Sequence, residues 1–255
     1  MDLGLEGRRI MVGGASRGLG AAIAEAAAGE GARIAAVARE SDALAAVAER
    51  IGGRAIPADL TTADGPVDAA RRAIEALGGL DGLVVNSGGP PTGSFATLDE
   101  AAWERAISGT LLAALRVIRT ALPALREGRD PAILIVLSSS VREPVANLVT
   151  SNVLRPGLNG LIKSLVGEIA PIRINGIAPG RIDTERVRSL DRARSEESGQ
   201  SIEQVQAQNL ARIPLGRYGQ PAELGRVGAF LLSPAASYVN GTVVAVDGGM
   251  IRSLP

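Results

Sequence analysis

The absence of cysteine and histidine is the strongest constraint on the chemistry of this 255-residue chain. Without cysteine the chain forms no disulfide, no thiolate nucleophile and no zinc–thiolate site. Without histidine it lacks the commonest general acid–base group and the commonest metal ligand, so we expect no metal site. Lysine occurs once, as Lys163, and aromatic residues make up only 2%. Its core must therefore be built from Ala, Val, Ile and Leu.

Charge and hydropathy exclude several classes of partner. The 27 basic residues balance the 27 acidic ones, so no bulk field favours nucleic acid or an anionic membrane. Residues 1–6 are acidic and lack the apolar segment of a signal peptide. No uncharged apolar run reaches membrane-spanning length. We expect a cytoplasmic protein that acts on a small molecule and has no nucleic-acid or membrane partner.

Short apolar runs alternate with Ala- and Leu-rich helical patterns along the chain. The runs are continuous, as is typical of strands buried on both faces, and repeated β-then-α units predict a parallel sheet. We expect one Rossmann-like, doubly wound α/β domain over residues 1–255, with seven strands and helices on both faces. The predicted strands are 9–12, 33–38, 54–57, 82–86, 132–137, 173–177 and 242–246, and the predicted helices are 18–30, 41–51, 63–78, 99–127 and 156–170.

Residues 181–212 interrupt this alternation with a long, polar and charged stretch. A long insertion inside a compact domain is typical of a lid or a binding loop. We expect it to act as a substrate lid, and a merely solvated loop is the alternative.

A glycine-rich sequence, Val-Gly-Gly-Ala-Ser-Arg-Gly-Leu-Gly, occupies residues 12–20, between the first strand and the first helix. Gly14, Gly18 and Gly20 allow a tight turn and a close approach to a pyrophosphate. That group would then meet the free N–H groups of the helix. The spacing is G-x-x-x-G-x-G rather than the usual G-x-G-x-x-G. Its place at the first strand–helix junction indicates a dinucleotide site.

Further polar segments follow the later strands, at the edge where open α/β sheets bind ligands. They are Asp59-Leu60, Asn86-Ser87-Gly88-Gly89, Ser138-Ser139-Ser140, Pro179-Gly180-Arg181-Ile182-Asp183-Thr184 and the closing Val246-Asp247-Gly248-Gly249. Together with the glycine-rich sequence, they resemble the short-chain dehydrogenase/reductase superfamily over nearly the whole chain, and 3-oxoacyl-carrier-protein reductases in particular. By that resemblance Asp59 would bond the adenine amino group, Asn86 would lie beside the adenine ribose, and Thr184 would lie near the nicotinamide carboxamide or the pyrophosphate. The implied cofactor-binding set is Gly14, Ser16, Arg17, Gly18, Leu19, Gly20, Arg39, Asp59, Leu60, Asn86, Gly88, Arg155, Pro179, Gly180, Ile182 and Thr184.

The end of the second strand bears on the choice of cofactor. NAD binding normally places an acidic side chain there to bond the ribose hydroxyls. This strand ends with Ala38-Arg39-Glu40, and Arg17 lies in the glycine-rich loop. Two guanidiniums suit a 2′-phosphate, so the sequence favours NADP(H) over NAD(H). Glu40 argues against this choice, and solvated surface arginines are the alternative interpretation.

The resemblance implies a catalytic Tyr-x-x-x-Lys pair that this chain lacks. Ser138 matches the family serine, but Ser151 stands at the tyrosine position, Arg155 at the lysine position and Thr110 at an asparagine position. Arginine stays protonated and does not relay protons. A carboxyl group of raised pKa is the possible substitute, with Glu143, Asp183 and Glu185 as candidates; each is expected instead to be solvated or ion-paired.

Pro156 suggests a different role for Ser151, because proline is tolerated only in the first turn of a helix. The helix is therefore expected to begin near Asn152 or later, with Ser151 or Asn152 as its cap.

Three functions remain open at this stage. The first is an NADP(H)-binding oxidoreductase with a divergent active site. The second is a non-catalytic dinucleotide-binding sensor or partner protein. The third is a non-redox reaction on the same fold, as in the halohydrin dehalogenases, which the intact glycine-rich loop disfavours. The resemblance also implies a homo-oligomer, most simply a tetramer.

Overall fold

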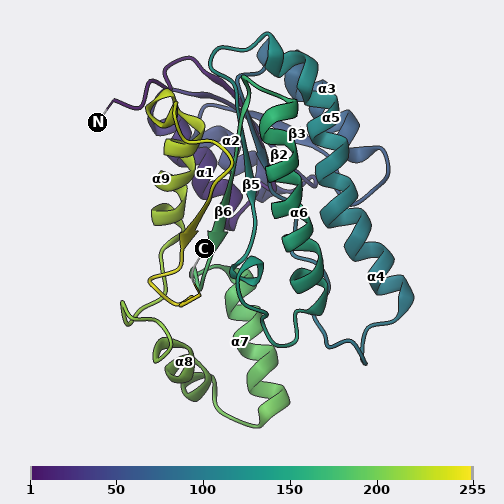
Figure 1. Cartoon of the computed structure of the whole chain (residues 1–255), viewed down its shortest axis with the longest axis vertical. Helices are drawn as coiled ribbons and strands as arrows, with labels where there is room; N and C mark the ends of the chain where they lie inside the picture. Colours follow the sequence, from purple (N-terminus) through teal and green to yellow (C-terminus); the bar gives the residue numbers. More distant parts are fainter. Residues whose placement is uncertain (1, 254–255) are drawn as a thin grey trace.

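A seven-stranded parallel sheet forms the centre of the computed structural model, which describes residues 2–253 (Figure 1). The strand order is β3-β2-β1-β4-β5-β6-β7, and it reverses between β1 and β4, where open sheets of this kind bind ligands. This confirms the predicted fold. The strands are β1 (Arg9–Gly13), β2 (Arg33–Ala38), β3 (Arg54–Pro57), β4 (Gly82–Val85), β5 (Ala132–Val136), β6 (Arg173–Pro179) and β7 (Val243–Val246).

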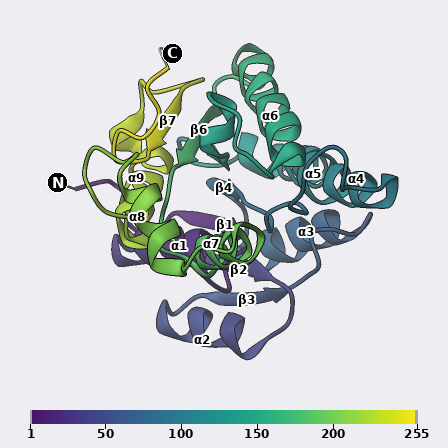
Figure 2. The same ribbon diagram turned by 90° about the horizontal axis from the view of Figure 1, so that it is seen from below.

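Helices cover both faces of the sheet (Figure 2), and each face has its own apolar cluster. Ala, Val, Ile and Leu supply nearly all of both clusters, as the scarcity of aromatic residues requires. One face carries α1 (Gly18–Gly29), α2 (Asp42–Arg50) and α9 (Pro221–Leu232). The other face carries α3 (Gly65–Leu77), α4 (Glu100–Ala106), a π-helical segment (Ile107–Leu112), α5 (Ala113–Arg126) and α6 (Val149–Glu168).

Helix α9 was not among the predicted helices. It packs so closely on α1 that a Cβ atom at Gly225 would lie 2.3 Å from the carbonyl oxygen of Ala22. The sequence does carry a start signal, since the Gln220 N–H donates to the Glu223 carboxylate at 2.7 Å and Pro221 occupies the first turn.

The start of α6 corrects the expectation drawn from Pro156. The helix begins at Val149 and continues through Pro156, so neither Ser151 nor Asn152 is its cap. Tertiary contacts hold the first turns. The Asn152 side chain bonds both the N–H and the carbonyl of Val145, at 3.0 and 2.9 Å, and the Thr150 hydroxyl donates to Pro91 at 2.8 Å. These bonds offset a proline cost of ~3 kcal/mol.

The insertion at 181–212 is mostly helical. It forms α7 (Glu185–Ser198) and α8 (Ile202–Leu210), which extend beyond the carboxyl ends of the strands (Figure 1). Each begins with a side-chain cap, Thr184 for α7 and Ser201 for α8. The polarity of this insertion follows from its position, because α7 and α8 contribute only three buried residues between them: Asp191, Val205 and Asn209.

One helical stretch, 100–126, is long and apolar enough to cross a membrane by length and composition. In this fold it is a core helix. Six residues of α5 are buried, and five of them belong to the apolar cluster on that face of the sheet.

At the amino ends of the strands, Asp81 joins β1 to β4. It accepts hydrogen bonds from the Arg9 side chain, from the Arg9 backbone N–H and from the Arg129 N–H. Burial alone would raise the pKa of Asp81, but these bonds hold it well below its usual range. Its stabilising effect is therefore fully present above the unfolded-state pKa near ~3.9. The effect is lost as the pH falls through the lower folded-state value.

We expect Asp81→Asn to lower the free energy of unfolding by about 3 kcal/mol at pH 7, because it leaves Arg9 without its counter-ion. Urea denaturation measures the change. The matched control is Asp130→Asn, since the Asp130 carboxylate also contacts an arginine, Arg8, but is 70% exposed. Equal losses of unfolding free energy in the two variants would contradict the stabilising role assigned to the Asp81–Arg9 pair.

Candidate functional site

A cleft of about 2170 Å³ lies at the carboxyl ends of the strands. Residues that follow β1, β2, β4, β5 and β6 line it, and α7 closes one side. Of the residues predicted from sequence for the site, all except Gly20 line this cleft.

The glycine-rich loop has the backbone geometry that its sequence predicts. Gly14 and Gly18 adopt φ values of +59° and +60°, which glycine adopts without strain. Gly20 lies behind the loop, where a Cβ would be 2.3 Å from the Gly14 carbonyl oxygen. The Asn86 amide supports the loop by donating to the Gly13 carbonyl at 3.1 Å.

Helix α1 begins directly after this loop. Its N-cap, Arg17, makes no side-chain cap bond, so the first N–H groups of the helix remain available to an anion. A pyrophosphate therefore fits this end of the cleft, between the loop and the helix.

The adenosine end of the cleft contains Asp59 and Arg39. Asp59 accepts two bonds from Thr61, from its N–H at 2.9 Å and from its hydroxyl at 2.7 Å. These bonds lower the pKa of Asp59, with a smaller contribution from the positive charge of Arg39. Both bonds engage Oδ1 of Asp59, so Oδ2 is available to a donor such as an amino group. Arg39 is exposed and makes no salt bridge within residues 2–253.

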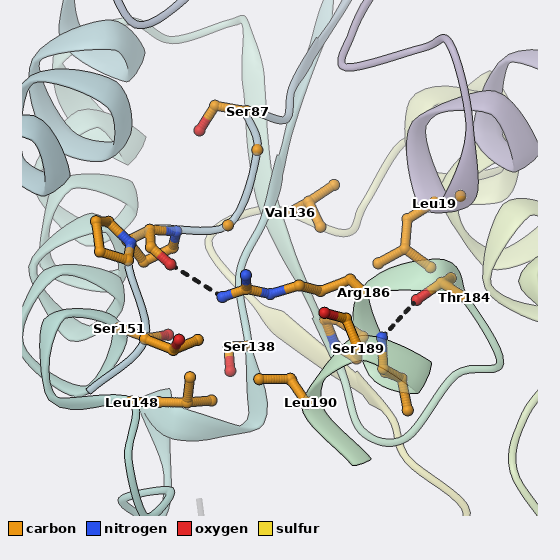
Figure 3. A pocket seen from close by; sticks show the side chains of 18 of the residues that line it. Leu19, Ser87, Val136, Ser138, Leu148, Ser151, Thr184, Arg186, Ser189 and Leu190 are labelled. Atoms are coloured by element: carbon orange, nitrogen blue, oxygen red, sulfur yellow. Dashed lines mark hydrogen bonds between the residues drawn. The ribbon is translucent and has the colours of Figure 1, made fainter. Parts of the chain in front are cut away.

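Ser138 and Ser151 line the middle of the cleft (Figure 3). Ser138 follows β5, and its Oγ accepts the Ser140 N–H at 3.1 Å, which leaves the Ser138 hydroxyl proton free to donate. The hydroxyls of Ser140 and Ser151 are 3.1 Å apart and both residues are buried. Ser151 is therefore bonded to Ser140 and does not cap the helix.

Arg155 lies one helical turn after Ser151 and is 7% exposed. Its Nη1 donates to the Val136 carbonyl, and its Nε is buried with no partner among the described residues. Burial, and secondarily the charge of Arg186, lower the pKa of Arg155 to about 10. Arg155 thus remains charged at neutral pH and does not supply a proton to a substrate.

Thr110 reaches the same cleft from the π-helical segment and is 2% exposed. Such segments within α-helices occur frequently at functional sites. The structure thus brings together the four predicted catalytic positions, Thr110, Ser138, Ser151 and Arg155, from three different parts of the chain.

The three carboxylates considered as substitute acids all lie near arginines. Asp183 bonds Arg188 at 2.9 Å and Glu185 bonds Arg192 at 2.5 Å. The exposed carboxylate of Glu143 is 3.9 Å from a guanidinium nitrogen of Arg212. This agrees with the expectation that they are solvated or ion-paired.

Neither tyrosine lines the cleft. Tyr218 donates to Asp191 at 2.9 Å and accepts from Asn209 at 3.2 Å, and burial raises its pKa. Tyr238 is fully exposed. The cleft therefore contains no phenol.

Sequence reasoning missed Arg186. This residue extends from the second position of α7 across the cleft, above Ser138 and Ser151 (Figure 3), and donates to the Pro90 carbonyl at 2.9 Å. Its sequence neighbours carry no signal that separates it from the other arginines of the insertion. Only the fold places it opposite the loop after β4.

Comparison with known proteins now identifies the family. Residues 14–251 match the family model described as enoyl-(acyl carrier protein) reductase. The 3-oxoacyl-[acyl-carrier-protein] reductase MabA of Mycobacterium bovis is 32% identical over 246 residues, covering 95% of this chain and 92% of the relative. The chain belongs to the short-chain dehydrogenase/reductase superfamily. Its class is that of NAD(P)-dependent oxidoreductases.

Solved structures of the superfamily share the fold. L-sorbose reductase from Gluconobacter frateurii, complexed with NADPH and L-sorbose, is 30% identical, with a TM-score of 0.91 and full coverage of both chains. A 3-oxoacyl (acyl-carrier-protein) reductase from Agrobacterium tumefaciens with NADP bound is 28% identical, with a TM-score of 0.85, covering 97% of this chain and 95% of that one. The substrates named for these relatives range from L-sorbose to 3-oxoacyl-(acyl-carrier-protein), so the comparisons indicate a class and no substrate.

Proposed function

We propose that this protein binds NADP(H) and is an oxidoreductase of a carbonyl or alcohol substrate, with a divergent active site. The observation that carries the proposal is the contrast within one cleft. The nucleotide half has its glycine loop, its free helix N-terminus and its available Asp59 oxygen, whereas Ser151 and Arg155 occupy the positions where the resemblance implies Tyr and Lys.

The preference for the phosphorylated cofactor rests on Arg39 and Arg17. Both line the cleft and both are exposed. Neither forms a salt bridge within residues 2–253, so both guanidiniums are available to a 2′-phosphate. Two of the structural relatives were solved with NADPH or NADP, which supports the same choice.

The nicotinamide group, when bound, supplies hydride chemistry. The chain itself contributes Ser138, whose free hydroxyl proton is available to a substrate oxygen. Arg155 contributes a fixed positive charge and no proton, and the Ser151 hydroxyl is bonded to Ser140. General acid–base catalysis typically contributes ~10²–10⁴-fold. Reduction of ordinary ketones is therefore expected to be slow.

A non-catalytic sensor or partner protein is the second candidate, since the same missing acid supports it. Measurable turnover of a carbonyl or alcohol substrate would distinguish the oxidoreductase from this non-catalytic protein. A non-redox reaction is disfavoured by the retained glycine loop, because that loop serves nucleotide binding.

The assembly and the lid are part of the same proposal. Resemblance supports a homotetramer, and residues 181–212 fit a substrate lid because α7 lines the cleft.

Nucleotide titration by calorimetry, followed by a screen of carbonyl and alcohol substrates, tests this function. We expect NADPH to bind, and Gly20→Ala to weaken binding by about 10- to 100-fold because a shifted loop loses charge-assisted hydrogen bonds. Gly29→Ala is the matched control, since a Cβ there, in the same helix, meets nothing within 4 Å. A wild type that binds neither nucleotide would refute the proposal.

A further inference from the structure

Two arginines face the reaction centre without a carboxylate partner. Arg155 is buried, and its Nε has no hydrogen-bond partner among residues 2–253. Arg186 enters the cleft from α7 and forms no salt bridge in that described part of the chain. The two charges are close enough for Arg186 to lower the pKa of Arg155. The middle of the cleft is therefore positively charged.

Four acidic groups of the lid are engaged with other partners. Asp191 bonds Arg181, Asn209 and Tyr218, and Glu197 accepts from Asn147 at 2.7 Å. Asp183 and Glu185 pair with other arginines of α7, as described above. None of them is bonded to Arg155 or Arg186.

The present contact of Arg186 uses little of its bonding capacity. Its guanidinium lies against Gly89, where a Cβ would be 3.0 Å from Cζ, and Nη2 donates to the neutral carbonyl of Pro90. That is one hydrogen bond from a group with five donors. Arg186 is exposed to solvent overall, and the partial desolvation of its guanidinium lowers its pKa. A fork-shaped group in this setting suits a carboxylate or a phosphate.

We propose that the substrate carries an oxyanion, a carboxylate or phosphate group, which Arg186 binds beside Ser138 while Arg155 contributes a second positive charge. This inference rests on the proposed function and narrows it to anionic oxo compounds. A guanidinium at the second position of the lid helix would also couple substrate binding to the position of the lid.

Matched pairs of ligands test the proposal by binding rather than by turnover. The pairs are pyruvate and methyl pyruvate, 4-oxopentanoate and its methyl ester, and dihydroxyacetone phosphate and dihydroxyacetone. Calorimetry measures each against the NADP⁺-saturated protein. We expect at least one anion to bind more tightly than its neutral partner. Arg186→Gln should weaken the binding of that anion by about 10- to 100-fold, as expected for a lost charged hydrogen bond. It should change the affinity of the neutral ligand by less than about 2-fold.

Arg188→Gln is the control, because Arg188 is an exposed arginine on the same helix whose guanidinium pairs with Asp183. Whether the carboxylates or the phosphate respond identifies which oxyanion the site takes. If Arg186→Gln weakened the binding of the anion and of its neutral partner equally, Arg186 would serve only to hold the lid helix to the Pro90 carbonyl. That result would overturn the inference. So would weaker NADP⁺ binding in Arg186→Gln with no change for the anions, or failure of every anion to bind better than its partner. Failure to bind NADP⁺ at all refutes the proposed function instead.

Discussion

Replacing Ser151 by Tyr and Arg155 by Lys together is expected to raise kcat/KM for NADPH-dependent ketone reduction by about 100- to 10 000-fold. Position 151 lies in the first turn of α6 and position 155 one turn later, so both side chains project from the same face of a regular helix. Both residues are buried and line the cleft with Ser138. A phenol at 151 would supply the acid that this cleft lacks.

The single variants are expected to gain little. A phenol without a nearby ammonium keeps a pKa near ~10, and an ammonium without the phenol has no proton donor to tune. The measurement is NADPH oxidation with an activated ketone, with NADPH affinity followed in parallel. Thr110→Asn is the third change to add, because Thr110 lines the same cleft from the π-helical segment.

Two results would contradict this explanation. A wild type that already turns over at ~1–10³ s⁻¹ would show that another acid operates, and Glu143→Gln would then be the first variant to measure. A double variant that binds NADPH normally yet gains no activity would show that the site is reorganised rather than stripped of its acid.

Reversing the charge at position 39 is expected to have the next largest effect. Arg39→Asp should weaken NADPH binding by about 10- to 100-fold, because a charge-assisted contact to the 2′-phosphate is lost and a like charge replaces it. NADH affinity should stay the same or rise, since an acidic side chain at this strand end can bond both ribose hydroxyls. Calorimetric titration of both nucleotides measures the ratio.

Arg33→Asp is the control for this variant. Arg33 begins the same strand, β2, and is exposed at the opposite end, away from the cleft. Its nucleotide affinities should match those of the wild type. Equal affinities for NADPH and NADH in the wild type would contradict the assigned preference, whatever the variants do.

The strands and the nucleotide loop could be predicted from sequence because local physics decides them. Buried parallel strands require continuous apolar runs, and β2 and β3 have the predicted ends. Gly14 and Gly18 adopt positive φ, a conformation that glycine tolerates at no steric cost. The absence of histidine, of cysteine and of a Tyr-x-x-x-Lys pair can likewise be read directly from the sequence.

Long-range contacts decided the rest. Pro156 indicated a late start for α6, yet the helix begins at Val149, where Asn152 bonds the nearby Val145 backbone and Thr150 bonds the carbonyl of Pro91, 59 positions away. Ser151 thereby became a partner of Ser140 rather than a cap.

Arg186 shows most clearly what sequence alone does not contain. In the sequence it is one arginine among several in a polar insertion, while in the fold it crosses the cleft to Pro90, which lies 96 positions away. The isolation of Arg155 and Arg186 from carboxylates likewise depends on which acidic groups the fold has already paired. A net charge of zero in the sequence is thus compatible with two unpaired arginines in one cleft, because tertiary structure, not composition, sets where charges remain unpaired.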